Sequence, residues 1–155
     1  MADMLVNLYQ MPPMEEIMKT MEEAGIRILQ PLSPDFHKVL SFIEKEFGKG
    51  WASETSASLY HQPVSCYIAV KDHEVIGFAC YDATARGYFG PTGVKESERG
   101  KGIGKALLLA CLYGMKEVGY GYAIIGSAGP GDFYAKSCGA RVIPDDRPNI
   151  YGKMV

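Results

Sequence analysis

Apolar residues recur along the chain with two different periods, and the changes between them outline the secondary structure. Over 14–24 and again over 36–47, apolar side chains return every three or four residues, as on one face of a helix. A glycine directly follows each segment, where it suits the end of a helix. Ser33 and Pro34 suit the start of the second segment as N-cap and first helical residue. The pattern therefore predicts two early helices.

Shorter apolar runs bounded by turn residues predict the strands. The clearest is a hairpin over 66–82, where two apolar runs flank a polar turn at Asp72 and His73. The run 88–94 contains a proline and a glycine, which inside a strand mark an edge, a bulge or a close approach to the backbone. The remaining strands are expected over 4–9, 26–32 and 122–127, with a final strand pair over 141–143 and 150–155.

A strand–loop–helix–strand unit dominates the second half of the chain. A helix from about 102 to 117 separates the runs 88–94 and 122–127. A right-handed crossover makes two such strands parallel and brings them near each other. Elsewhere we expect a loop over 48–58 and short helices near 54–61 and over 131–140. This order favours a mixed α/β (α+β) domain.

The composition is that of a soluble globular protein of one domain. The chain has 155 residues, of which 47% are hydrophobic and 22% charged. Its net charge of −2 argues against nucleic acid as a partner. No apolar run approaches the ~20 residues that span a bilayer, and the N-terminus lacks the basic start of a secretory signal. These features favour a cytoplasmic protein without a membrane partner.

The four cysteines are expected to be free thiols. Cys66, Cys80, Cys111 and Cys138 form no Cys-x-x-Cys pair, and the three histidines share no ligand spacing with them. We therefore expect no metal site.

The stretch SERGKGIG places glycines and charges just ahead of a helical pattern. A Walker loop would need a glycine where Arg99 stands and a hydroxyl where Ala106 stands, and the dinucleotide fingerprint lacks its third glycine. The pattern Arg/Gln-x-x-Gly-x-Gly/Ala matches over 99–104. Backbone N–H groups at the positive end of a helix would form an anion cradle there, and Lys101 and Lys105 would add charge.

Two segments resemble the GCN5-related N-acetyltransferase (GNAT) superfamily. They are GVKESERGKGIGKALL (93–108) and FYAKSCGA (133–140), and the resemblance extends over roughly 26–155. It implies an enzyme that moves an acetyl group from acetyl-CoA to a primary amine of a small molecule or peptide. The amine would attack directly in a ternary complex, and no metal is needed.

The resemblance also implies the architecture. The fold is a mixed sheet of about seven strands in a single GNAT-like domain, 1–155. Two central parallel strands, here 88–94 and 122–127, splay apart and admit the pantetheine arm of acetyl-CoA. Residues 1–25 lie outside this core and are interpreted as an N-terminal addition.

The site residues follow from the same resemblance. The cofactor would be bound by Gly93, Val94, Arg99, Gly100, Lys101, Gly102, Ile103, Gly104 and Lys105. The N–H of Val94 would hydrogen-bond the oxyanion of the tetrahedral intermediate. Tyr134 stands where many family members have a tyrosine that protonates the coenzyme A sulfur. The same tyrosine also suits the packing of a helix on the sheet.

The acceptor side stays open at this point. Glu54, Asp82 and Glu96 are candidate general bases by position, each equally a surface acid, and some relatives use ordered water instead. Trp51 either lines a substrate pocket or packs. The family often has an asparagine after the second splayed strand, but this chain has GSAGPGD there.

Two other functions fit the same residues. A non-catalytic acyl-CoA-binding sensor would keep the cradle without the tyrosine or an acceptor pocket. An interaction protein would have a glycine turn that binds nothing. The family resemblance also allows a homodimer, with an amine acceptor as the other partner.

Overall fold

A seven-stranded mixed sheet forms the middle of the computed structural model, which describes residues 1–155. The strands are β1 (Met4–Asn7), β2 (Arg27–Leu29), β3 (Cys66–Lys71), β4 (Glu74–Tyr81), β5 (Tyr88–Val94), β6 (Tyr122–Ile125) and β7 (Arg141–Val142). They lie in the order β2-β3-β4-β5-β6-β1-β7. Every neighbouring pair is antiparallel except β5 and β6, which are parallel. The expected mixed architecture is thus confirmed.

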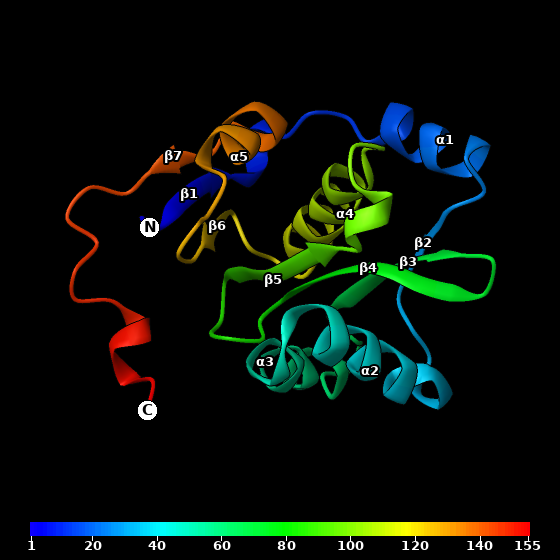
Figure 1. Ribbon diagram of the computed structural model, residues 1–155. Helices are drawn as coiled ribbons and strands as arrows, with labels where there is room; N and C mark the ends of the chain where they lie inside the picture. The colour runs from blue at the N-terminus through cyan, green and yellow to red at the C-terminus, as the bar shows by residue number, and fades with distance from the viewer.

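Helices cover both faces of the sheet (Figure 1). They are α1 (Glu15–Glu23), α2 (Phe36–Phe47), α3 (Lys49–Leu59), α4 (Ile103–Glu117) and α5 (Gly131–Cys138). Helix α4 packs on β3, β4 and β5, with α1 beside it, while α2 and α3 pack on the opposite face. Ten of the 15 residues of α4 are buried, as expected for a helix that is apolar on most sides. None of the helices combines the length and apolar character that a bilayer-spanning segment needs.

The parallel strands β5 and β6 stay together over only two residue pairs. Tyr88 lies opposite Ile124, and Phe89 lies opposite Ile125, where β6 ends. The rest of β5, from Thr92 to Val94, pairs with β4 alone. The two central strands therefore diverge and leave a wedge between them, as the family resemblance implies.

The hairpin over 66–82 is confirmed down to its turn. Asp72 and His73 both have positive φ, at 51° and 64°. A two-residue turn of this kind matches the right-handed twist of the strands that it joins.

Two expectations are wrong. Residues 48–58 are not a loop, because α3 begins directly after Gly48, whose φ of 102° turns the chain. The small polar residues that resembled a loop let α3 approach the sheet closely, with Thr55 and Ser58 fully buried. Residues 150–155 form no strand: Ile150–Lys153 is a 3-10 helix (η4), and β7 pairs with β1 instead.

The N-terminal segment, interpreted above as an addition to the family core, contributes β1 to the sheet and Leu8 to the hydrophobic core. β1 stands between β6 and β7 in the sheet. Met4, Val6 and Leu8 are 3%, 0% and 0% exposed. The alternation of buried and exposed residues along β1 fits a strand with one covered face.

We expect Leu8→Ala to lower the free energy of unfolding by about 2–5 kcal/mol, because it leaves a cavity in the core. Leu5→Ala is the matched control, since Leu5 is 39% exposed, and it should change stability by at most about 0.5 kcal/mol. Urea denaturation followed by circular dichroism measures both. Equal, small effects would show that the N-terminal segment is not part of the core.

Candidate functional site

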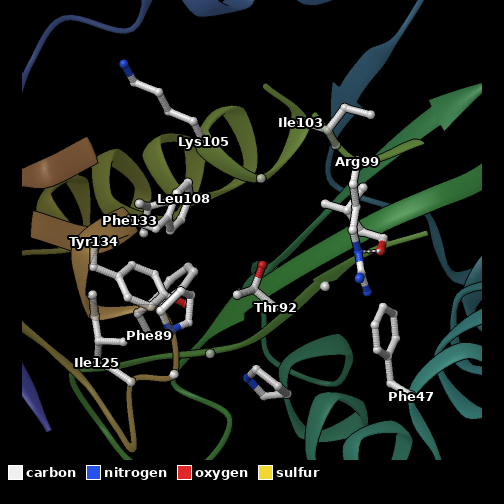
Figure 2. Close-up of a pocket in the computed structure, with 18 of the residues that line it drawn as sticks. Phe47, Phe89, Thr92, Arg99, Ile103, Lys105, Leu108, Ile125, Phe133 and Tyr134 are labelled. Atoms are coloured by element: carbon white, nitrogen blue, oxygen red, sulfur yellow. Dashed lines mark hydrogen bonds between the residues drawn. The ribbon is translucent and has the colours of Figure 1, made fainter. Parts of the chain in front are cut away.

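A cavity of about 850 Å³ opens in the wedge between β5 and β6. Its lining comes from both faces of the sheet: from α4 and α5 on one side, and from α2 and α3 on the other (Figure 2). The cavity also touches the glycine-rich loop and the chain that follows β6. One continuous space thus connects the loop, the diverging strands and the opposite face.

The glycine-rich loop ends at the N-terminus of α4. Gly100 and Gly102 have φ of 82° and 87°. Glycine adopts this left-handed region without the steric strain that a Cβ causes in other residue types. Gly102 is the N-cap of α4 and no side chain caps the helix, so the N–H groups of its first turn keep their hydrogen-bonding capacity. Gly104 faces the cavity, and a Cβ there would lie 3.7 Å from the ring of Phe133. The loop has the features of an anion site.

Two basic side chains of the loop, which the sequence analysis expected to add charge for an anion, are bonded within the protein. Lys101 donates a hydrogen bond of 2.5 Å to Glu98, which holds the pKa of that carboxyl below its usual range. Arg99 Nε donates to the Val94 carbonyl at 3.2 Å, and its side chain runs back toward Phe47 (Figure 2). Lys105 lines the cavity. The backbone, more than the side chains of Arg99 and Lys101, is therefore what the loop offers to an anion.

Tyr134 lies in the cavity wall on the side of α5. It is 5% exposed, and burial raises the pKa of its phenol to about 12, with a smaller contribution from Cys138. Its ring packs edge-on against Phe89 and Phe133, with centroids 6.3 and 5.1 Å away. The phenol is thus protonated at neutral pH and also part of the helix packing.

Two aromatic rings line the opposite end of the cavity. Phe47 and Trp51 stack, with centroids 5.3 Å apart and planes inclined by 28°. The Phe47 ring fits there because residue 93 is glycine: a Cβ would come within 2.5–2.8 Å of the ring. The sequence marks Trp51 as a candidate for lining a pocket, whereas its pattern places Phe47 only on a helix face. The unusual glycine inside β5 was the available signal.

The three candidate bases do not line the cavity. Glu54 accepts a hydrogen bond from the Thr84 hydroxyl. Asp82 accepts two bonds of 2.8 Å, from the Gly87 N–H and the Tyr120 hydroxyl. Glu96 is exposed in the turn after β5. The structure therefore brings together the loop, Tyr134 and Trp51, but none of these acids.

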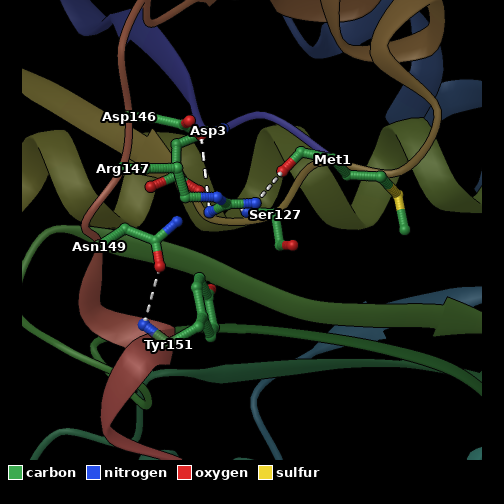
Figure 3. Close-up of polar contacts among 7 residues, drawn as sticks. All are labelled: Met1, Asp3, Ser127, Asp146, Arg147, Asn149 and Tyr151. Carbon is green, nitrogen blue, oxygen red and sulfur yellow. Dashed lines mark hydrogen bonds and ion pairs between the residues drawn. The ribbon is translucent and has the colours of Figure 1, made fainter.

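The two chain termini hold the end of β6 (Figure 3). Asp3 accepts a bond of 2.7 Å from the Ser127 N–H, and its own N–H donates to Asp146 at 2.8 Å. The ring of Tyr151, from η4, occupies the place where a side chain at Gly126 would be. Gly126 and Ser127 line the cavity, so these contacts fix its wall on the side of β6.

A mixed sheet that opens between two parallel strands, beside a glycine-rich helix N-terminus, defines the fold of the acyl-CoA N-acyltransferases. The chain belongs to the acetyltransferase (GNAT) family, whose model matches residues 14–140. No curated protein matches the sequence.

Solved structures with this fold come from varied proteins. The chain is similar to the GCN5-related glucosamine N-acetyltransferase region of a fungal multi-domain GH3 β-N-acetylglucosaminidase, with a TM-score of 0.75, 15% identity, and coverage of 92% of this chain and 19% of that one. A GCN5-related N-acetyltransferase from Sphaerobacter thermophilus matches with a TM-score of 0.68, 21% identity, and coverage of 92% and 48%. An Escherichia coli GNAT family N-acetyltransferase in complex with CoA matches with a TM-score of 0.50, 19% identity, and coverage of 62% and 59%. The chain thus spans less than half the length of the first two, and these likenesses show the shared fold.

We expect Gly93→Ala to change the fluorescence of Trp51, the only tryptophan in the chain. The new Cβ displaces the Phe47 ring and breaks its stack on Trp51. Gly104→Ala is the control, because its Cβ would meet its nearest neighbours at 3.7 Å and beyond. An unchanged emission spectrum in folded Gly93→Ala protein would contradict the described packing.

Proposed function

We propose that the protein is an N-acetyltransferase that moves the acetyl group of acetyl-CoA to a primary amine. The main support for this proposal is the wedge between β5 and β6. It connects the N-terminus of α4, on one face of the sheet, to the end of the cavity lined by Phe47 and Trp51, on the other face. An elongated acyl donor needs such a passage, with an anion site at one end and room for an acceptor at the other. Family membership supports the same reaction class.

The proposed cofactor site is built mainly from backbone. The diphosphate would bind the N–H groups between Arg99 and Lys105, where the helix dipole favours negative charge. The pantetheine arm would lie along the free edge of β5. The residues proposed for cofactor binding are Gly93, Val94, Arg99, Gly100, Lys101, Gly102, Ile103, Gly104 and Lys105.

The ladder between β4 and β5 supports Val94 as the oxyanion donor. The Lys95 N–H donates to the Ile76 carbonyl at 2.8 Å, toward β4. Successive N–H groups of an antiparallel strand point to opposite sides, so the Val94 N–H faces the wedge, as does that of Thr92. Either N–H would stabilise the negative charge that develops on the thioester oxygen.

Besides the proton transfers, the reaction forms one carbon–nitrogen bond and breaks one carbon–sulfur bond. The amine nitrogen attacks the thioester carbonyl carbon, and the carbon–sulfur bond then breaks to release coenzyme A. The sulfur leaves with the bonding electron pair and takes a proton, which Tyr134 would donate. The amine nitrogen loses a proton to water, and water returns one to Tyr134, so the products are an amide and a free thiol.

The experiment that tests this function measures free thiol. The protein is incubated with acetyl-CoA and a panel of primary amines, and a thiol reagent follows the release of coenzyme A. Release that requires both an amine and the protein supports the transferase. Tight binding of acetyl-CoA without release on any amine favours the sensor function instead.

We expect Gly104→Asp to weaken acetyl-CoA binding at least about tenfold, which is about 1.4 kcal/mol. A carboxylate there repels the diphosphate, whereas an acidic residue in the first turn of a helix favours the fold. Gly104→Ala separates the effect of charge from that of volume and should bind far more tightly than the aspartate variant. Isothermal calorimetry gives the three dissociation constants. Equal dissociation constants for the parent protein and Gly104→Asp would contradict the proposal that the diphosphate binds this loop.

We expect Tyr134→Phe to lower kcat about 100-fold with little change in the KM for acetyl-CoA, because only the proton donor is lost. In the parent protein the raised pKa, about 12, keeps the phenol protonated through pH 10. The kcat profile should therefore show no descending limb between pH 8 and 10. Tyr122→Phe, at a 56% exposed tyrosine, is the control. A kcat in Tyr134→Phe equal to that of the parent protein would show that Tyr134 has only a packing role.

A further inference from the structure

The cavity end beyond the wedge is walled by aromatic rings. Phe47 and Trp51 reach it from the end of α2 and the start of α3, and their rings stack at 5.3 Å. Trp51 also packs on the buried Phe78, with centroids 6.2 Å apart. Because Trp51 remains 39% exposed, part of its ring is free to contact a ligand.

This aromatic wall is fixed in place by the fold. Gly93 leaves room for the Phe47 ring, and Gly48 turns the chain so that Trp51 comes back over Phe47. The Phe42 ring also packs edge-on against Phe47, with centroids 6.0 Å apart. A rigid aromatic surface binds a flat ligand without first having to order its own side chains.

Among the charged side chains that line the cavity, that of Arg99, which is positive, runs toward Phe47 (Figure 2). Glu98, Arg99 and Lys105 belong to the glycine-rich loop and the start of α4. The carboxylate of Glu98 already has Lys101 and Lys71 as partners, at 2.5 and 3.8 Å.

The candidate acids Glu54 and Asp82, which lie outside the cavity lining, are also engaged. Glu54 bonds to Thr84, and Asp82 bonds to Gly87 and Tyr120. A second positive charge on an acceptor would therefore find no free carboxylate among the cavity-lining residues at the aromatic end.

We infer that the acceptor is a primary amine on an aromatic or similarly flat apolar body, with Phe47 and Trp51 as the residues that determine specificity. The inference rests on the proposed acetyl transfer and names its substrate class. Apolar surroundings disfavour the charged form of an amine. An amine bound against these rings therefore loses its proton more easily, which suits a cavity whose lining includes none of the three candidate bases.

The test compares amines in the thiol-release assay with the full chain. Tryptamine and phenethylamine carry rings, butylamine lacks one, spermidine adds charges, and glucosamine adds hydroxyl groups. We expect kcat/KM for the two ring-bearing amines to exceed the others by about tenfold or more. Trp51→Ala should remove most of this preference through KM, Trp51→Phe should retain much of it, and butylamine should be little affected. Tyr60→Ala is the control, at a 72% exposed aromatic residue outside the cavity.

Each outcome decides between the claims. Spermidine or glucosamine acetylated as efficiently as tryptamine would overturn the aromatic class and uphold the transferase. An equal loss on all amines in Trp51→Ala would likewise overturn it. No release on any amine by protein that binds acetyl-CoA in calorimetry would also overturn this acceptor class. Protein that does not bind acetyl-CoA would overturn the proposed function itself.

Discussion

The separation of β5 from β6 is the constraint on which the rest of the site depends. Two residue pairs hold the strands together, and from there each strand is held by other partners. β5 stays on β4, while the end of β6 is fixed by β1 and by the bonded pair Ser127 and Asp3. A continued ladder would fill the wedge with backbone hydrogen bonds. The wedge persists because both of its walls are anchored from outside.

The remaining parts of the site are placed by that opening. The apolar helix α4 is buried against the sheet, so its N-terminus has a fixed position beside the end of β5. The loop before it needs left-handed backbone at Gly100 and Gly102, which leaves its N–H groups near the cavity. On the other face, the absence of a side chain at Gly93 lets Phe47 approach β5. The proposed anion site, the wedge and the aromatic wall thus all border β5.

The local pattern predicted most of the fold, and long-range pairing accounts for what it missed. The recurrence of apolar residues predicts α4, and the right-handed crossover predicts that β5 and β6 are parallel and close together. The place of β1 beside β6 was not predictable, because strand order depends on contacts between residues 4–7 and 122–125 that no local pattern encodes. The apolar residues of η4 predict a strand, because their pattern does not reveal the Asn149 cap, whose side chain accepts a hydrogen bond from the Tyr151 N–H. Within the proposed site, the glycine loop has a readable motif, whereas Phe47 joins the cavity only through tertiary packing.

The measurement that tests the central claim most directly is thermal unfolding with acetyl-CoA, coenzyme A and ATP in parallel. A ligand at 100 times its dissociation constant adds about 2.7 kcal/mol of stability. In a chain of this size that raises Tm by about 5–10 °C. If the wedge holds a pantetheine arm, both coenzyme A species produce this shift and ATP, which has no such arm, does not. An equal shift with ATP, or none with any of the three, would contradict the account.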